Sequence, residues 1–307
     1  MIRAENLTRR FGDLVAVDRL SFEVERGELF GLVGPDGAGK TTTLRMLAGV
    51  LRPSEGDAIL DGVSVARDPE RVKHGLAYMS QRFGLYADLT VLENLEFYAD
   101  LYQVPRRERA KRLARLFEFS NLGPFQDRLA GKLSGGMKQK LGLSCALIHQ
   151  PVILLLDEPT FGVDPVSRRD LWLIVHEMVA EGVTAVVSTA YMDEAERFDR
   201  LALLHKGRIL ALDNPEALQQ GFEGEVLEVR VDRPREARER LLGHPAVRRA
   251  ALFGDRLHLT VGSAEADGPA ITEALRQAGF EVQGVRSVPP SLEDVFIEDI
   301  AAAEVAA

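Results

Sequence analysis

Hydrophobic and polar residues follow a strand-like pattern through much of the first two thirds of the chain. Alternation in residues 2–7 and 20–25 predicts two paired strands, and residues 56–65 resemble a hairpin. Apolar runs at 29–33 and 152–156 are typical of parallel strands buried on both faces, and 184–189, with Ala185, Val186 and Val187 at its centre, is predicted to be another buried strand. Further strands are expected at 76–81, 201–204 and 208–211. These elements predict an α/β domain that also contains antiparallel strands.

Helical spacing separates these strands. It appears at 42–50, 171–180 and in a short segment from Pro215, and it dominates the region from Phe83 to Leu147, which we expect to form a helical subdomain. Residues 85–102 are unusually aromatic, and any exposed part of them would make a docking patch. The arginine-rich segment 106–115 is interpreted as a solvated helix face.

A different order of elements follows a boundary expected near Gln220. Strands are predicted at 225–231, 247–253, 256–261 and 280–288, and helices at 234–242 and 269–278. This βαββαβ order predicts a small α+β, ferredoxin-like domain. Ser291 is a good N-cap for a last helix. We therefore expect one domain at 1–220 and a second domain, with a role in folding, assembly or regulation, at 222–307.

Composition narrows the class of protein. The 307 residues include 28% charged and 46% hydrophobic side chains, which is ordinary for a soluble protein. No apolar run approaches the ~20 residues of a membrane span, and early charges such as Arg3 and Glu5 argue against a signal peptide. The single cysteine, Cys145, fits a reducing compartment and a packed thiol. The net charge of −9 argues against a nucleic-acid partner.

The strongest motif lies between the first buried strand and the first helix, and it fits G-x-x-x-x-G-K-[ST]. It comprises Gly34, Pro35, Asp36, Gly37, Ala38, Gly39, Lys40, Thr41 and Thr42. Glycines let backbone N–H groups surround an anion, and the helix N-terminus adds partial positive charge. We expect Lys40 to reach the outer phosphates of a nucleotide and Thr41 to offer its hydroxyl to Mg²⁺.

Two acidic residues give the second strong signal. Asp157 and Glu158 end a buried strand, at the edge where open α/β sheets bind ligands. Carboxylates are costly there unless a cation or a reaction needs them. We expect Asp157 to hold Mg²⁺ through its water shell and Glu158 to orient or deprotonate the attacking water. Gln81, at another strand end, is either a loop cap or a ligand of Mg²⁺ or water.

Two further features are ambiguous by themselves. Phe11 is equally well interpreted as a core ring or as a platform on which a flat base stacks. Ser134, Gly135 and Gly136 open a helix whose exposed N–H groups favour an anion, although a serine N-cap with flexible glycines explains the same residues.

The order of these motifs resembles the ATP-binding subunit of ABC transporters over residues 1 to about 220. The resemblance implies a P-loop NTPase fold for this ATP-binding domain, with an antiparallel β subdomain and a helical subdomain. The matching segments are the Walker A loop at 34–42, the Q-loop Gln81, the signature Leu133-Ser134-Gly135-Gly136, the Walker B pair Asp157-Glu158 and the D-loop 162–164. Phe11 matches the aromatic residue that stacks on adenine in this family. The C-terminal domain, ending in Leu292-Glu293-Asp294-Val295-Phe296, resembles that of bacterial drug and antibiotic exporter ATPases.

The resemblance implies ATP and Mg²⁺ as ligands and a head-to-tail pair of ATP-binding domains, formed with an identical copy or a paralogue. In such a pair Ser134, Gly135 and Gly136 act on the partner's ATP. A transmembrane permease subunit would dock near residues 83–102, which places the chain in the cytoplasm, peripheral on the inner face of the membrane. Export of a drug-like or other small molecule is the implied function.

One position departs from the family. The strand ending at Thr189 is usually followed by a histidine that touches the γ-phosphate, and here it is followed by Ala190. Hydrolysis is therefore expected to be slow, either because the chain pairs with a different ATPase or because a homodimer turns over slowly. The alternatives are a regulatory subunit with little hydrolysis and a soluble ABC ATPase outside transport. The acidic balance and the lack of a heptad insertion disfavour the last.

Overall fold

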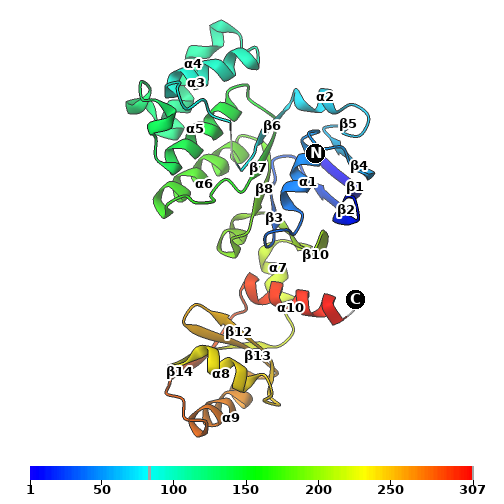
Figure 1. Ribbon diagram of the computed structural model, residues 1–307, viewed down its shortest axis with the longest axis vertical. Coiled ribbons are helices and arrows are strands. Elements are labelled where there is room, and N and C mark those ends of the chain that lie inside the picture. The colour runs from blue at the N-terminus through cyan, green and yellow to red at the C-terminus, as the bar shows by residue number, and fades with distance from the viewer. Residues whose placement is uncertain (82–83, 306–307) are drawn as a thin grey trace. The chain divides into compact units, whose positions relative to one another are not determined.

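The computed structural model describes residues 1–81 and 84–305. Its internal contacts divide the chain into two units, Met1–Leu212 and Asp213–Ala307 (Figure 1). The short helix α7 (Pro215–Gln220) groups with the second unit, so this division falls before the boundary that we expected near Gln220.

An antiparallel sheet opens the first unit. It contains β1 (Ile2–Phe11), β2 (Leu14–Val24), β4 (Glu55–Leu60) and β5 (Val63–Ser64) in the order β2-β1-β4-β5. The predicted strand pair and hairpin are confirmed, although β1 and β2 are longer than expected because they continue to a tight turn between Phe11 and Leu14. The short helix α2 (Pro69–Lys73) follows this sheet.

A second, six-stranded sheet carries the candidate site. Its strands are β3 (Leu29–Val33), β6 (Leu76–Met79), β7 (Ile153–Asp157), β8 (Thr184–Thr189), β9 (Arg200–His205) and β10 (Arg208–Asp213), in the order β10-β9-β3-β8-β7-β6. Strands β9, β3, β8, β7 and β6 pair in parallel, which confirms the interpretation of the apolar runs. The segments that follow β3, β7 and β8 therefore leave the same edge of the sheet.

Helix α1 (Lys40–Leu47) lies between the two sheets of this unit. Its residues Leu44, Met46 and Leu47 are fully buried in a core shared by both sheets. The helix begins two positions earlier than the periodicity suggested, so that Lys40 and Thr41 belong to its first turn.

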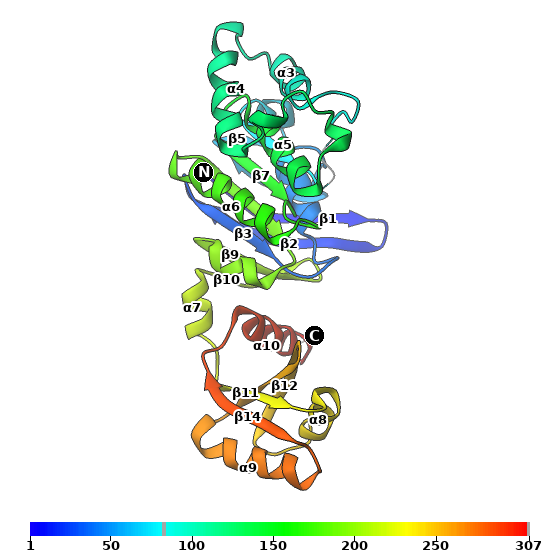
Figure 2. The ribbon, with the colours of Figure 1, turned by 90° about the vertical axis from the view of Figure 1, so that its left-hand side faces the viewer.

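The remaining helices of the first unit are α3 (Val91–Leu101), α4 (Arg106–Ser120), α5 (Gly135–Leu147) and α6 (Pro165–Ala180). Short 3₁₀ turns lie at Gly123–Phe125, Ala130–Lys132 and Met192–Arg197. Helix α6 lies across the parallel sheet (Figure 2). We expected it only from Leu171, but it begins at Pro165 because the Asp164 side chain caps it by accepting from the Ser167 amide at 3.0 Å.

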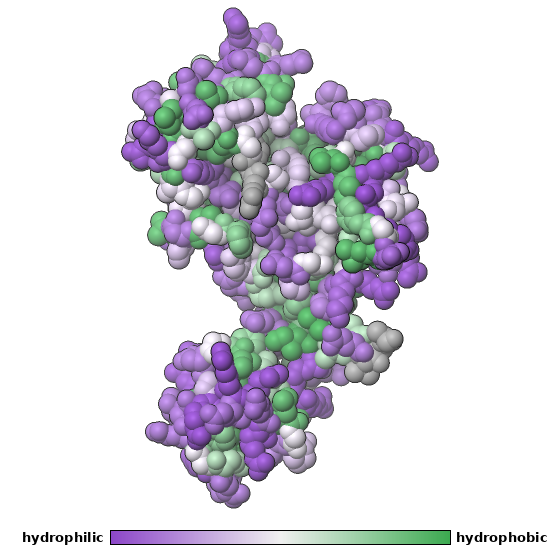
Figure 3. All heavy atoms as spheres, in the orientation of Figure 1, coloured by the Kyte–Doolittle hydropathy of each residue, from purple (hydrophilic) through white to green (hydrophobic). Residues whose placement is uncertain are grey.

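The expected helical region is present, although Phe83, its predicted first residue, lies outside the described residues. In α4 the only buried residues are Leu116 and Ser120, and the surface around this helix is hydrophilic in Figure 3. The solvated face is confirmed for Arg106, Arg107 and Lys111, whereas Arg109 and Arg112 turn inward and donate to the carbonyl oxygens of Val104 and Ile148. Cys145 is buried and unpaired in α5, and burial raises the pKa of its thiol, as expected of a packed cysteine. Among the described helices none combines the length and apolar character needed to cross a membrane.

The second unit is a four-stranded antiparallel sheet with three longer helices. Strands β11 (Glu225–Val231), β12 (Val247–Phe253), β13 (Arg256–Val261) and β14 (Val282–Val288) adopt the order β12-β13-β11-β14. Helices α8 (Pro234–Leu241) and α9 (Ala264–Gln277) pack their apolar residues on one face, and α10 (Leu292–Val305) follows β14. The βαββαβ order is confirmed, whereas α9 begins before the expected Pro269 because the Ser263 side chain caps it.

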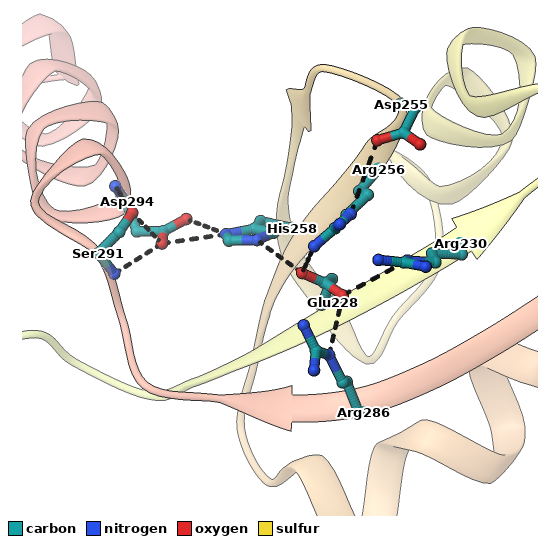
Figure 4. A network of polar contacts seen from close by, with 8 residues as sticks. All are labelled: Glu228, Arg230, Asp255, Arg256, His258, Arg286, Ser291 and Asp294. Atoms are coloured by element: carbon teal, nitrogen blue, oxygen red, sulfur yellow. Dashed lines mark hydrogen bonds and ion pairs between the residues drawn. The ribbon is translucent and has the colours of Figure 1, made fainter. Parts of the chain in front are cut away.

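The other face of this sheet carries a polar network (Figure 4). Glu228 is buried on β11 and accepts hydrogen bonds from Arg256 at 2.8 Å and Arg286 at 2.9 Å. His258 lies between Glu228, at 4.0 Å, and Asp294 of α10, at 3.0 Å. The network therefore fastens the start of α10 to the sheet.

We expect this network to stabilise the second unit in a pH-dependent way. The Arg286 hydrogen bond lowers the pKa of Glu228 to about 2 from 4.5. Since the folded-state pKa is the lower one, the stabilisation is complete above about pH 4.5 and is lost as the pH falls towards 2. Glu228→Gln should lower the urea midpoint of the second unit at pH 7, and the difference from wild type should narrow below pH 4.5. Methyl NMR signals of β11 would report this transition.

A matched variant is Asp255→Asn, which removes a carboxylate 89% exposed beside Arg256 and should leave that midpoint unchanged. A wild-type and Glu228→Gln difference that stayed constant down to pH 3 would contradict the assigned role of the Glu228 charge.

Candidate functional site

The loop of residues 34–39 joins β3 to α1 and depends on its glycines. A Cβ on Gly34 would collide with the carbonyl oxygen of Leu204, and one on Gly39 would lie 2.8 Å from that of Ala16. Gly37 and Gly39 also have φ values of 79° and 103°, in the left-handed region. Only glycine lets the loop pack this closely, and the resulting turn delivers backbone N–H groups to the N-terminus of α1, as an anion site requires.

Lys40 is buried at the start of α1, with 4% of its side chain exposed. Its ammonium donates to the carbonyl oxygens of Gly34 at 2.8 Å and Pro35 at 3.0 Å, and it lies 3.0 Å from a carboxylate oxygen of Glu158. The charge is thus held at the mouth of the loop by a partner that an incoming phosphate could replace.

Asp157 is the last residue of β7, and its carboxylate accepts hydrogen bonds from three hydroxyl groups. Its Oδ1 accepts from Thr41 at 2.8 Å and from Ser188 at 2.9 Å, and its Oδ2 accepts from Tyr78 at 3.3 Å. Burial, helped by the Asp157 charge, raises the pKa of Tyr78 to about 12, so the phenol remains a donor at neutral pH. The carboxylate is therefore fixed against the first turn of α1, beside the phosphate loop.

Glu158 has an unusual backbone conformation. Its φ of 49° lies in the left-handed region, which costs a non-glycine residue of the order of 1 kcal/mol. Its N–H donates to the Ser188 hydroxyl at 3.0 Å, and its carboxylate accepts from Gln81 at 3.0 Å and pairs with Lys40. The strained turn separates the directions of two consecutive carboxylates, so that Asp157 reaches Thr41 while Glu158 reaches Lys40 and Gln81.

These side chains fit a magnesium ion. The hydroxyl of Thr41, the carboxylate of Asp157 and the amide oxygen of Gln81 are all hard oxygen donors, the kind that Mg²⁺ prefers. The described residues contain no cluster of three or more His, Cys, Asp or Glu side chains that could hold a metal alone. Such a sparse donor set suits an ion that takes its other ligands from phosphate and water.

A cavity of about 500 Å³ lies over the loop. It is lined by Phe11, Leu14, Val15, Ala16, Asp36, Gly37, Gly39, Lys40, Thr41, Thr42, Gln81, Glu158 and Lys206. Phe11 is 45% exposed and lines the cavity, so it is not a core ring. The lining of the cavity therefore combines an aromatic ring with the loop, Lys40 and Glu158.

The residues of the expected signature do not line this cavity. Ser134 caps α5 by accepting from the Met137 amide at 3.3 Å, and it and Gly135 are exposed. A Cβ on Gly136 would collide with Ser167 of α6, so that close packing fixes the helix start. The exposed Ser134 and Gly135 are thus not brought to their own chain's phosphate loop.

Ala190 is exposed directly after β8. The segment around it is fixed, because Thr189 donates to Glu194 at 2.7 Å and accepts from the Tyr191 amide at 3.0 Å. All six histidines lie in the described part of the chain, and none lines the cavity. No imidazole compensates for the alanine within this chain.

The sequence reasoning missed several residues of the site, which are Tyr78, Ser188, Lys206 and the cavity-lining Leu14, Val15 and Ala16. Ser188 holds both Asp157 and the Glu158 amide, and the signal available was a polar residue at the end of a buried strand. Lys206 lines the cavity from the β9–β10 turn, where the Gly207 amide donates to the Ala38 carbonyl at 3.1 Å. Nothing in the local sequence around Lys206 indicated that this turn reaches the loop.

Comparisons with known proteins agree with this geometry. Residues 17–161 match the family model described as ABC transporter, and residues 214–300 match the C-terminal domain of ATP-binding protein DrrA1-3-like. The chain is 43% identical over 305 residues to the probable multidrug ABC transporter ATP-binding protein YbhF of Escherichia coli strain K12, covering 97% of this chain but 52% of that protein. This chain thus spans about half the length of that relative.

A second relative is similar over nearly its whole length. The daunorubicin resistance ATP-binding protein DrrA2 of Streptomyces coeruleorubidus is 34% identical over 301 residues, which cover 96% of this chain and 94% of that protein. A dimeric solved structure of a bacterial ABC transporter cassette is 25% identical, with a TM-score of 0.64 over 70% of this chain and 98% of that one. The chain therefore belongs to the ATP-binding subunits of ABC transporters, a family of ATPases, and carries a DrrA-like C-terminal domain.

Proposed function

We propose that this chain binds Mg·ATP in the cavity above residues 34–42 and hydrolyses it to drive export through a partner membrane permease. The observation that carries the proposal is that one cavity is lined by an exposed aromatic ring, a glycine-rich phosphate loop, a threonine hydroxyl held by the buried Asp157, and a strained glutamate. These four features are suited, respectively, to an adenine, a triphosphate, a magnesium ion and an attacking water.

Each group of residues in the cavity would contact a different part of Mg·ATP. Phe11 would stack on the adenine, the loop amides would hold the phosphates, and Lys40 would leave Glu158 for the outer phosphates. Thr41 and Asp157, with Gln81, would hold Mg²⁺, which when bound neutralises charge on the phosphates. Once Lys40 has left, Glu158 is free to orient a water and accept its proton, with Gln81 fixing the carboxylate.

The signature residues support a pair of ATP-binding domains. Ser134 and Gly135 are exposed at the N-terminus of α5 and lie off their own chain's cavity. Backbone N–H groups at a helix start suit a phosphate, so a second chain's ATP is the ligand that fits them. A homodimer and a pair with a paralogue both satisfy this arrangement.

The aromatic segment supports docking to a permease. Tyr86, Phe97, Leu101 and Tyr102 remain 47%, 37%, 58% and 36% exposed on or beside α3. The rings of Tyr86 and Phe97 meet edge to face with centroids 4.6 Å apart, so part of this surface is one continuous patch. Docking there would place the chain on the inner face of the membrane. The multidrug and daunorubicin-resistance names of the relatives favour a drug-like cargo.

Ala190 favours one alternative, a regulatory subunit that binds ATP but hydrolyses little. Both functions need the same cavity, and they differ in turnover. Measuring ATP hydrolysis by the chain alone and with the proteins that co-purify from membranes distinguishes them. Sustained hydrolysis that depends on Glu158 supports an ATPase that drives export. Binding of ATP without turnover supports a regulatory subunit.

The binding half of the proposal is tested by Lys40→Ala. We expect the Kd for Mg·ATP to rise about tenfold or more, because a charge-assisted hydrogen bond of at least ~1.5 kcal/mol is lost. Titration calorimetry on the full chain measures this change. The matched variant Lys111→Ala removes an exposed lysine of α4 and should bind like wild type. Equal affinities for wild type and Lys40→Ala would contradict the assignment of the phosphate site.

A further inference from the structure

Phe11 ends β1 beside a tight turn, and a ring so exposed at a hairpin end needs support to keep one orientation. The support in the structure is Arg9. Residues two apart on a strand point to the same face, and the guanidinium carbon of Arg9 lies 4.6 Å from the centroid of the Phe11 ring. This is a cation–π contact of ordinary geometry.

Arg9 is itself held in place. Its Nη1 donates to the carbonyl oxygen of Arg52 at 2.9 Å, which ties β1 to the segment before β4. Its Nε is buried and makes no hydrogen bond to any residue that the structure describes. The position of the guanidinium therefore rests on two contacts, the Arg52 carbonyl and the aromatic ring.

The two side chains also differ in what they face. Phe11 lines the cavity above the phosphate loop, whereas Arg9 does not. The guanidinium thus packs on a ring that lines the cavity and is 45% exposed, without lining the cavity itself. A fixed ring loses less rotational freedom when a base stacks on it than a freely turning ring would.

We propose that Arg9 is a positioning residue for the nucleobase, holding the Phe11 ring in the orientation that it presents to adenine. The inference rests on the proposed function, since it takes the cavity to be the ATP site. It assigns to Arg9 an effect on the base alone. The phosphates would be held by the loop and Lys40, whereas the contacts of Arg9 are with Phe11 and the Arg52 carbonyl.

The test compares two ligands on the full-length chain, Mg·ATP and Mg·tripolyphosphate, by titration calorimetry. Arg9→Met keeps the length of the side chain and removes its charge. We expect it to raise the Kd for ATP about two- to fivefold, the range of a partly exposed cation–π contact, and to leave the Kd for tripolyphosphate unchanged. Arg9→Lys, which keeps the charge without the planar group, should fall between wild type and Arg9→Met.

A matched control and a double variant separate positioning from a general effect on folding. Arg10→Met removes the neighbouring arginine, which is 50% exposed and lies 3.5 Å from Glu55, and should bind both ligands like wild type. In a Phe11→Leu background the Arg9→Met effect on ATP should disappear, because no ring remains to be held.

Each failure has a different meaning. Equal weakening of ATP and tripolyphosphate by Arg9→Met, an unchanged Kd for ATP, or an effect that persists in Phe11→Leu would overturn the role of Arg9 and leave the proposed function intact. A wild-type chain that bound neither ligand would overturn the proposed function and this inference together.

Discussion

Glu158→Gln is expected to lower the rate of ATP hydrolysis at least about a hundredfold, because glutamine keeps the shape of the side chain but cannot take a proton from water. Binding of Mg·ATP should not weaken. The Glu158 carboxylate lies 3.0 Å from Lys40 and competes with phosphate for its ammonium. Removing that charge should leave the Kd for Mg·ATP unchanged or lower. Phosphate release and titration calorimetry on the same preparation measure the two effects.

The matched control is Glu177→Gln, which makes the same chemical change at an exposed position of α6 and should leave both quantities unchanged. Wild-type turnover in Glu158→Gln would show that another group activates the water. Loss of ATP binding together with turnover would indicate that the Glu158 carboxylate mainly supports the structure of the loop, against the role assigned here.

Much of the fold was predictable because the pattern of apolar residues in the sequence reflects which faces of each strand or helix are buried. A run such as 152–156 is apolar without alternation only where both faces of a strand are covered, and β7 lies between β6 and β8 as that pattern requires. Helix starts were less predictable. Asp164 and Ser263 act as N-caps of α6 and α9. Because of the prolines at 165 and 269 and the turn-like composition around them, we predicted that both helices begin at later residues.

In the candidate site, too, some residues were predictable from the sequence and others were not. Lys40, Thr41 and Asp157 follow from motifs, because phosphate and metal chemistry restrict which residues can stand at those spacings. The conformation of Glu158 and the double role of Ser188 depend on β7 and β8 becoming neighbours, with Asp157 opposite Ser188. No local pattern encodes that pairing. For the same reason the turn at Lys206 could be placed over the loop only in the folded chain.

Ala190→His is expected to raise the rate of ATP hydrolysis by up to about a hundredfold, the value of one well-placed donor to transition-state charge, about 3 kcal/mol. The site can accept the larger residue, since Ala190 is exposed. The backbone there is already fixed by Thr189 and Glu194, so an imidazole would start from a defined position after β8. The change should appear in kcat, with little effect on the Kd for ATP, because the missing contact matters most as charge develops on the phosphate.

Ala190→Leu is the matched variant, because it adds bulk without a donor and should hydrolyse ATP no faster than wild type. Whether the faster hydrolysis by Ala190→His requires a partner protein then distinguishes the two explanations of the alanine, a slow homodimer and a pair with a paralogue. In a slow homodimer, Ala190→His accelerates the isolated chain. If the chain pairs with a paralogue, acceleration requires that paralogue, because its signature residues complete the site. Equal rates for wild type, Ala190→His and Ala190→Leu under both conditions would mean that a missing donor at this position does not limit hydrolysis.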